Sequence, residues 1–223
     1  GQRPAPATLA VNLIGAGRIG GAVAVWLRAS PRYRLQEVIG RGTADWTAAA
    51  LSIDTAGPGA LRRLGPRLLA EGDLWSVGAA ALADEGFRAE MAEIARRSGH
   101  RLRLFTGWIS GPNLAPFATA ARLHVTQMAP NLGPQPGILF NGPLAEAVLA
   151  FPDHLNTACA AALAGPGIGR TSIELISSEP GGAHLIRAEF ARPGSRIVSE
   201  VNFTQAPGEL HPGCSAIIAA LER

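Results

Sequence analysis

No lysine occurs in the chain, and all 20 basic residues are arginine. This absence excludes mechanisms that need a lysine Schiff base, a lysine general base or the lysine of a phosphate-binding P-loop. The single tyrosine, Tyr33, has no lysine four positions after it, so the Tyr–Lys pair of short-chain dehydrogenases is excluded too. Negative charge on a substrate must therefore be met by arginine, histidine, hydroxyl groups or backbone N–H groups.

Cysteine, long apolar runs and clustered charge are also scarce. The two cysteines, Cys159 and Cys214, show no metal-binding spacing and are too few for a disulfide framework, so we expect no metal site and a reducing compartment. We find no stretch of about 20 apolar residues and no export signal. The net charge of +3 comes from dispersed arginines. We therefore expect a cytoplasmic protein that binds a small molecule, and neither nucleic acid nor a membrane.

The 223 residues, 47% of them hydrophobic, suffice for one large domain or two small ones. The first half alternates strands, expected over residues 9–14, 35–39, 74–77 and 101–105, with helices, expected over 19–28, 58–69 and 84–97. The Gly-containing segment 106–112 breaks this alternation. Beyond it we expect strands over 123–127, 173–177, 184–190 and 196–202, and helices over 143–150, 155–164 and 214–221. Residues 46–54 are ambiguous, and 130–137 are expected to form a loop. These patterns predict an α/β fold with a Rossmann-type parallel sheet and a second, smaller α/β domain of mixed sheet.

A GxGxxG motif directly follows the first expected strand and opens the first expected helix. Its six residues are Gly15, Ala16, Gly17, Arg18, Ile19 and Gly20. In dinucleotide-binding folds the first glycine permits a tight turn, the second lets the backbone approach the pyrophosphate, and the third lets helix and strand pack closely. A plain structural turn is the alternative, but the strand–loop–helix context favours a dinucleotide site.

The residues about 20 positions after this loop bear on the choice of cofactor. An NAD-preferring enzyme presents Asp or Glu there to the ribose hydroxyls, whereas this chain has Gly40-Arg41-Gly42. A guanidinium can pair with a 2′-phosphate, so Arg41 favours NADP over NAD. The alternative is that Arg41 is a solvated surface residue.

A series of short motifs runs in order through nearly the whole chain. They are Leu13 to Gly20, Ser76 to Ala79, Leu82 to Asp84, Thr106-Gly107, Phe151-Pro152, Asn156, Arg170-Thr171 and His184 to Arg187. Their order and approximate spacing resemble the L-aspartate dehydrogenase family. The resemblance implies a homodimer in which a Rossmann domain over residues 1–107 is completed by a C-terminal helix over 208–223. Residues 108–207 would then form the substrate-binding and dimerisation domain.

The resemblance also implies the reaction and the site. In that family aspartate is oxidised reversibly to iminosuccinate, and hydride passes to NAD or NADP. It implies that His184 is the catalytic acid/base, and that Asn156 and the position of Trp108 contact the cofactor. Histidine suits this task because its unperturbed pKa lies near neutrality. We expect further cofactor contacts at Ala56, Val77 and Gly78, and substrate contacts at Ser110, His211 and Ser215.

Several residues depart from the family pattern near the expected pocket. Trp108 and Ser110 replace small residues, Gly182 replaces an asparagine before His184, and a typical Asn-Pro-Lys-Thr-Ser run appears here as residues 211–215. Two alternatives therefore stay open: a reductase of a different imine or oxo acid on the same scaffold, or a noncatalytic NAD(P)-binding protein. His184 could also be an ordinary strand residue, with His211 as a second catalytic candidate, and Asp54 could either border the cofactor cleft or cap a turn.

Overall fold

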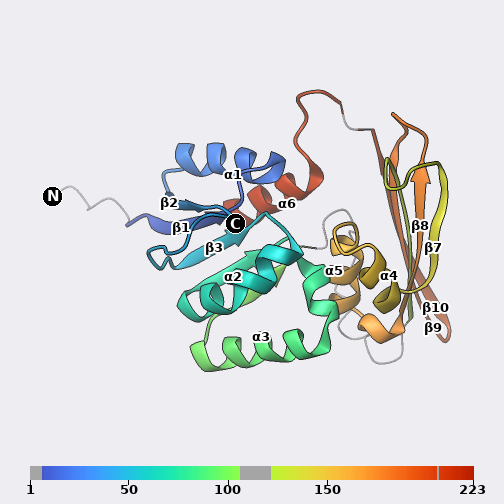
Figure 1. Ribbon diagram of the computed structural model, residues 1–223, viewed down its shortest axis with the longest axis horizontal. Helices are drawn as coiled ribbons and strands as arrows, with labels where there is room; N and C mark the ends of the chain where they lie inside the picture. The colour runs from blue at the N-terminus through green and yellow to red at the C-terminus, as the bar shows by residue number, and fades with distance from the viewer. Residues whose placement is uncertain (1–6, 106–121, 205) are drawn as a thin grey trace. The chain divides into compact units, whose positions relative to one another are not determined.

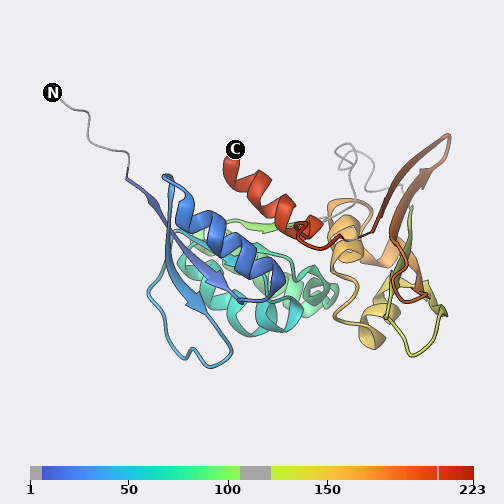
Figure 2. The ribbon, with the colours of Figure 1, turned by 90° about the horizontal axis from the view of Figure 1, so that it is seen from above.

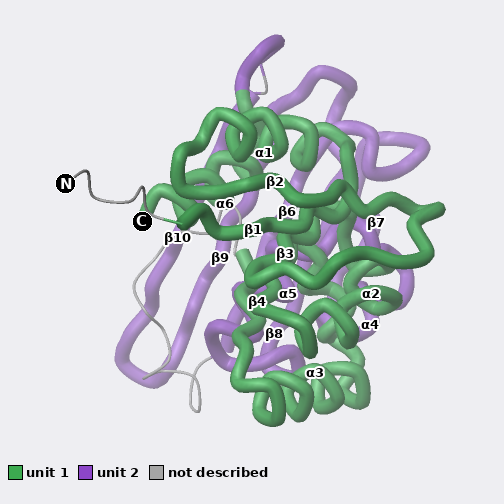
Figure 3. Tube along the Cα trace, turned by 90° about the vertical axis from the view of Figure 1, so that its left-hand side faces the viewer, with its two compact units in different colours: residues 1–105, 210–223 green, residues 106–209 purple. Residues whose placement is uncertain are grey.

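The computed structural model describes residues 7–105, 122–204 and 206–223. The chain divides into two compact units, shown in different colours in Figure 3. Unit 1 comprises residues 1–105 and 210–223, and unit 2 comprises residues 106–209. Within the described ranges, no helix has the length and apolar character needed to cross a membrane.

Unit 1 is built on sheet A, in which five parallel strands lie in the order β2-β1-β3-β4-β5 (Figure 1). The strands are β1 (Leu9–Ile14), β2 (Tyr33–Ile39), β3 (Leu51–Asp54), β4 (Asp73–Ser76) and β5 (Leu102–Leu104). The helices are α1 (Arg18–Ala29), α2 (Pro58–Glu71), the 3₁₀ helix η1 (Ala79–Ala83), α3 (Glu85–Ser98) and α6 (Pro212–Glu222). Helices α1 and α6 cover one face of the sheet, and α2 and α3 cover the other (Figures 1 and 2). Burial on both faces agrees with the largely apolar sequence of β1, the strand at the centre of the chain reversal.

The direction of chain growth across sheet A reverses between β1 and β3. From β1 the chain passes through α1 to β2 on one side, and from β3 it passes through α2 to β4 on the other. In open α/β sheets, ligands bind at the carboxyl ends of the strands that flank such a reversal. The end of β1 is therefore in the position expected for a dinucleotide-binding loop.

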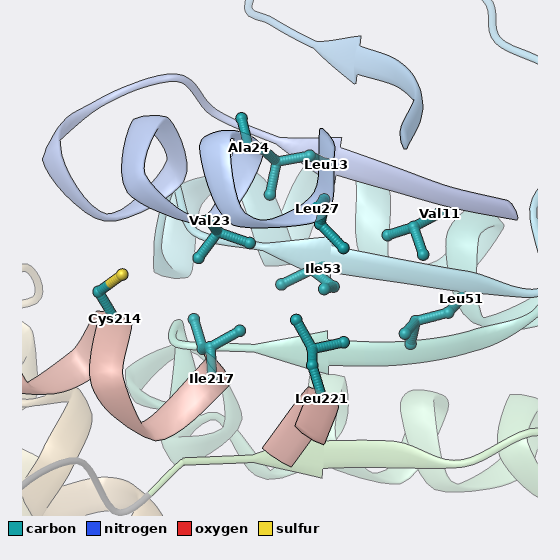
Figure 4. Close-up of a cluster of buried hydrophobic side chains, with 10 residues drawn as sticks. All are labelled: Val11, Leu13, Val23, Ala24, Leu27, Leu51, Ile53, Cys214, Ile217 and Leu221. Carbon is teal, nitrogen blue, oxygen red and sulfur yellow. The ribbon is translucent and has the colours of Figure 1, made fainter. Parts of the chain in front are cut away.

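An apolar core joins α1 and α6 to the centre of sheet A. Figure 4 shows this cluster, which consists of Val11, Leu13, Val23, Ala24, Leu27, Leu51, Ile53, Cys214, Ile217 and Leu221. Val23, Ala24 and Leu27 are spaced along one face of α1, as an amphipathic helix requires. The core thus fixes α1, and with it the glycine loop, against β1.

Unit 2 is built on sheet B, a mixed sheet with the strand order β10-β9-β6-β8-β7. Only β6 and β8 run parallel to each other. The elements are β6 (Arg122–Pro130), β7 (Gly137–Pro143), α4 (Leu144–Ala150), α5 (Asn156–Ala164), the 3₁₀ helix η3 (Ile168–Arg170), β8 (Thr171–Ser178), β9 (His184–Arg192) and β10 (Ser195–Phe203). Helices α4 and α5 lie on one face of this sheet (Figure 1).

These sheets confirm the predicted fold class, an α/β protein with a Rossmann-type parallel sheet and a further mixed sheet. Two strands were not predicted. The sequence around β3 was ambiguous because the strand spans only four residues, Leu51–Asp54. The strand β7 was missed because Gly137 and Pro143 flank a short apolar run, and its register shifts between Ile138 and Phe140. A sheet edge tolerates both features.

Candidate active site

The loop after β1 has the backbone shape that dinucleotide binding requires. Gly15 has a φ of 88°, a conformation that glycine adopts without strain, and a Cβ there would lie 3.0 Å from the Ala56 Cβ. A Cβ on Gly20 would lie only 2.3 Å from the Gly15 carbonyl oxygen, so this glycine allows α1 to pack against the end of β1. A Cβ on Gly17, by contrast, would meet no atom of the described residues within 4 Å. Gly17 therefore borders open space rather than a packed contact.

Helix α1 begins directly after Gly17, and its first turn suits an anion. No side chain within the described ranges caps the helix, and its first turn contains no acidic residue. The first N–H groups of a helix have no partner inside the helix, and the helix dipole adds partial positive charge there. Ala16 and Arg18 are exposed, whereas Ile19 packs on the core. The open backbone at Gly17 and these N–H groups fit the pyrophosphate of a dinucleotide.

The loop after β3 lies against the glycine loop. The Thr55 hydroxyl donates to the Ile14 carbonyl oxygen at 2.7 Å, and the Thr55 N–H donates to the same oxygen at 2.9 Å. A Cβ on Gly20 would lie 2.5 Å from the Thr55 Oγ1. Thr55 therefore joins the end of β3 to both ends of the glycine loop, and Ala56 lies next to Gly15.

The loop after β4 completes this edge of sheet A. The Val77 N–H donates to the Asp54 carbonyl oxygen at 3.0 Å, and its side chain packs on the core. A Cβ on Gly78 would lie 2.6 Å from the Gly57 carbonyl carbon, so the loops after β3 and β4 are in close contact. The cofactor residues predicted after β1, β3 and β4 thus lie along one edge.

A buried carboxylate, Asp54, ends β3 beneath these loops and is 1% exposed. Its Oδ1 accepts hydrogen bonds from the Ala56 N–H at 2.9 Å and the Gly57 N–H at 3.3 Å. Its Oδ2 accepts from the Ser76 hydroxyl at 2.7 Å, and the Ser76 Oγ accepts from the Gly78 N–H at 2.9 Å. Burial raises the pKa of Asp54 to about 6, although the hydrogen bonds act in the opposite direction.

Arg41 lies in an exposed turn that follows β2. The turn is closed by the Thr43 N–H, which donates to the Gly40 carbonyl oxygen at 3.3 Å, and by the Gly40 N–H, which donates to the Thr43 hydroxyl at 3.0 Å. The end of β2 is tied to the glycine loop, because the Gly15 N–H donates to the Ile39 carbonyl oxygen at 3.0 Å. Arg41 is therefore at the carboxyl edge of sheet A, two residues beyond that hydrogen bond.

His211 and Ser215 belong to unit 1 and lie at the start of α6. The His211 Nδ1 accepts from the Gly213 N–H at 3.0 Å and caps the helix. A Cβ on Gly213 would lie 3.3 Å from the Ile19 Cδ1, so the start of α6 adjoins the start of α1. Ser215 is exposed one turn further along. The accepting Nδ1 places the proton of a neutral His211 on Nε2.

His184 is the first residue of β9 and lies in unit 2. Its ring stacks on that of Phe203, its register partner in β10, with ring centroids 4.7 Å apart and an interplanar angle of 11°. Residues two apart on a strand share a face, and Ile186, Ala188 and Phe190 are buried. His184 is therefore on the buried face of sheet B, half-buried at the end of that row.

Asn156, the other predicted residue of unit 2, is the first residue of α5. The preceding turn is tied to sheet B, because the Gln127 Nε2 donates to the His154 carbonyl oxygen at 2.7 Å. Gln127 follows the buried Leu123 and Val125 of β6 at a spacing of two residues, so it lies on the same face of sheet B. This is the buried face that also carries His184. Its Oε1 is buried and has no hydrogen-bond partner among the described residues.

Two predicted positions, Trp108 and Ser110, lie outside the described residues. The sequence assigns no role to the side chains of Ser76 and Gln127, because their contacts depend on strand pairing that cannot be read from the chain. For Asp54 the sequence allows two interpretations, a residue that borders the cofactor cleft or a turn cap, and the signal for either is its position at the end of a short strand. Neither cysteine is a candidate nucleophile: both are buried free thiols, and burial raises the pKa of Cys159 to about 12.

Comparison with known proteins identifies relatives that share this organisation. The sequence model of the protein family described as aspartate dehydrogenase, C-terminal, matches residues 117–221. L-aspartate dehydrogenase 1 of Bordetella pertussis is 30% identical over 226 residues, which cover 85% of this chain and 86% of that protein. The L-aspartate dehydrogenase of Ruegeria pomeroyi is 34% identical over 191 residues, which cover 76% of this chain and 68% of that protein.

A solved structure supports the fold independently. The crystal structure of aspartate dehydrogenase from Thermotoga maritima matches with a TM-score of 0.75 at 16% identity, covering 97% of this chain and 96% of that chain. The fold, the ordered motifs and the extent of the sequence matches agree with one another. The chain belongs to the L-aspartate dehydrogenase family.

Proposed function

We propose that the protein is an NAD(P)-dependent L-aspartate dehydrogenase. The observation that carries the proposal is the edge of sheet A, where Gly15, Gly17 and Gly20 form a loop with an open, anion-binding helix start. Family membership supports aspartate as the substrate. We further propose a cytoplasmic location, because both cysteines are free thiols.

We propose that the two parts of the chain have different functions. The Rossmann domain, residues 1–107 with 208–223, would hold the dinucleotide along the loops after β1, β3 and β4, with Asn156 and Trp108 as contacts from the rest of the chain. Residues 108–207 would bind aspartate and carry the dimer contacts. We propose that three side chains donate hydrogen bonds to the substrate carboxylates: Ser110, His211 and Ser215. The chain has no lysine that could do so.

His184 is proposed as the acid/base of the reaction. A nicotinamide held at the edge of sheet A would supply the acceptor for the hydride that leaves Cα of aspartate. His184 would take the proton that the substrate ammonium must lose before its nitrogen can form the C=N bond of iminosuccinate. After releasing that proton to solvent, His184 would take a proton from the water that adds to the imine carbon, and would return it to the amino group, which leaves as ammonia when oxaloacetate forms. Stacking on Phe203 supports this role because it restricts the orientation of the imidazole.

Arg41 is proposed to favour NADP over NAD. It lies in an exposed turn at the carboxyl end of β2, the strand whose end carries the ribose-binding residue in dinucleotide folds. A guanidinium can form a bidentate pair with a 2′-phosphate. This proposal predicts a lower Kd for NADPH than for NADH.

We also propose a homodimer formed through the face of sheet B that α4 and α5 do not cover. On this face Arg187 pairs with Glu200 at 3.1 Å and Arg196 with Glu189 at 2.7 Å. Val198 is 43% exposed beside them. Because these two arginines and two glutamates pair within one subunit, together they present no net charge to an identical copy. Light scattering should give twice the chain mass, and Val198→Arg should shift the protein toward monomer.

Enzyme assays test the function directly. Purified protein should reduce NADP or NAD when L-aspartate is added, and should oxidise the reduced nucleotide when oxaloacetate and ammonia are added. His184→Ala should lower kcat by about a hundredfold or more while the Kd for NADPH is retained. His100→Ala is the matched control, because this histidine lies in unit 1 just before β5, and its Nδ1 makes a hydrogen bond with the Leu69 carbonyl oxygen at 2.8 Å.

Other outcomes of these assays would change the proposal. Faster turnover of another 2-oxo acid with ammonia would identify a different imine reductase on the same scaffold. Nucleotide binding without turnover of any tested substrate would identify a noncatalytic NAD(P)-binding protein.

A further inference from the structure

Among the described residues of unit 1, Asp54 is the buried carboxyl group that the proposed chemistry does not use. It is 1% exposed at the end of β3, and its register partner in β1 is Ile14, the residue before the glycine loop. Burying a carboxylate is unfavourable unless hydrogen bonds compensate it. The groups that donate hydrogen bonds to Asp54 therefore indicate the role of this side chain.

Every hydrogen bond to the Asp54 carboxylate fixes a segment of the predicted dinucleotide edge. Oδ1 holds the backbone N–H groups of Ala56 and Gly57 in the loop after β3. Oδ2 holds the Ser76 hydroxyl, which in turn accepts from the Gly78 N–H in the loop after β4. One side chain therefore orients backbone groups of two successive loops.

Close packing carries this constraint to the glycine loop. A Cβ on Gly78 would lie 2.6 Å from the Gly57 carbonyl carbon, and a Cβ on Gly15 would lie 3.0 Å from the Ala56 Cβ. The loops after β4, β3 and β1 therefore touch in series, with the segment that Asp54 holds in the middle. A displacement of that middle loop must move a neighbour on each side, because packed protein interiors have little free volume.

We propose that Asp54, acting partly through Ser76, is a positioning residue that shapes the dinucleotide site. Asp54 does not touch the reacting atoms, and its effect passes through the backbone at Ala56, Gly57 and Gly78. This inference rests on the proposed NAD(P)-dependent function. If Asp54 only capped the turn after β3, it would stabilise the fold without changing nucleotide affinity. The two roles therefore differ in a measurable way.

Calorimetric titration of NADPH into Asp54→Asn and Ser76→Ala tests the inference. An asparagine keeps an acceptor for one set of N–H groups but cannot accept from the Ser76 hydroxyl, and alanine at 76 leaves the Gly78 N–H without its acceptor. We expect the Kd for NADPH to rise about tenfold in each variant. The change should fall on nucleotide binding more than on the KM for aspartate.

Asp73→Asn is the matched control. The Asp73 Oδ1 also accepts from a backbone N–H, that of Arg101 at 2.8 Å, but Asp73 begins β4 at the opposite end of sheet A. Its Kd for NADPH should stay within about twofold of wild type. Melting temperatures measured without nucleotide show which variants are folded, and Ser76→Ala provides the test if Asp54→Asn does not fold.

The outcomes separate this inference from the proposed function. Folded Asp54→Asn or Ser76→Ala with a Kd within about twofold of wild type would overturn the positioning role and leave the function intact. A wild-type protein that binds neither NADPH nor NADH would overturn both.

Discussion

Gly20 provides the sharpest test of the glycine loop, because its packing and its neighbours are both known. An alanine there would place a methyl group 2.3 Å from the Gly15 carbonyl oxygen and 2.5 Å from the Thr55 Oγ1. Both distances are below the 3.0 Å that Cβ atoms essentially never cross, so α1 or the loop must move. The Gly20→Ala substitution therefore perturbs the join between β1 and α1.

The expected magnitude combines two opposing terms. Alanine in a helix is about 1 kcal/mol more favourable than glycine, whereas overpacking a tight contact costs about 1 to 3 kcal/mol. The unfolding free energy of Gly20→Ala should therefore fall by about 1 kcal/mol. Nucleotide affinity should fall by about tenfold or more, because the clash displaces the loop itself.

Gly21→Ala is the control, since a Cβ there would make an ordinary contact, 3.8 Å from the Ala16 carbonyl oxygen. This variant should gain up to about 1 kcal/mol of stability and bind NADPH within about twofold of wild type. Urea denaturation and NADPH titration of the two variants provide the comparison. Equal stability and equal affinity for Gly20→Ala and Gly21→Ala would refute the reasoning.

Three further predictions concern the same edge of sheet A. Arg41→Glu should weaken NADPH binding by about tenfold or more and NADH binding much less, and equal losses for both nucleotides would refute a contact with the 2′-phosphate. Thr55→Val removes the hydroxyl that donates to Ile14 and should lower the unfolding free energy by about 0.5 to 1.5 kcal/mol in urea denaturation, and an unchanged midpoint would contradict it. The pKa of Asp54 in the folded protein is about 6, above the ordinary value of 3.8. Its contribution to the free energy of unfolding is therefore fully present below pH 3.8 and is lost as the pH rises through 6. Asp54→Asn removes this titration, so the free energy of unfolding of the variant, relative to that of wild type, should rise by about 3 kcal/mol between those pH values. A difference that does not depend on pH would show that Asp54 is not buried as a titrating acid.

Much of unit 1 could be predicted from the sequence because its signals are local. The apolar run over residues 9–14, the GxGxxG loop and the helix after it follow one another without interruption, and each restricts the next. The helix expected over residues 84–97 has Asp84 as its N-cap, and the Asp84 Oδ1 accepts from the Phe87 N–H at 2.8 Å. Short-range hydrogen bonds of this kind leave a clear trace in the sequence.

Features that depend on distant pairing could not be predicted. Ser76 and Asp54 are 22 residues apart and meet only because β3 and β4 are neighbours in sheet A. Likewise, Phe203 reaches His184 through the register of β9 and β10. The sequence supplied a candidate histidine through the family resemblance, but the aromatic ring that stacks on it became visible only in the folded sheet.

Titration of NADPH and NADH into wild-type protein and into Gly17→Ala tests the central claim most directly. Among the residues that the structure describes, none has an atom within 4 Å of a Cβ at Gly17, so the variant should fold normally while its methyl group occupies the space proposed for the pyrophosphate. We predict saturable binding of at least one nucleotide by the wild-type protein and its loss in Gly17→Ala. Heat no greater than dilution for both nucleotides, or equal affinity in the two proteins, would contradict the account.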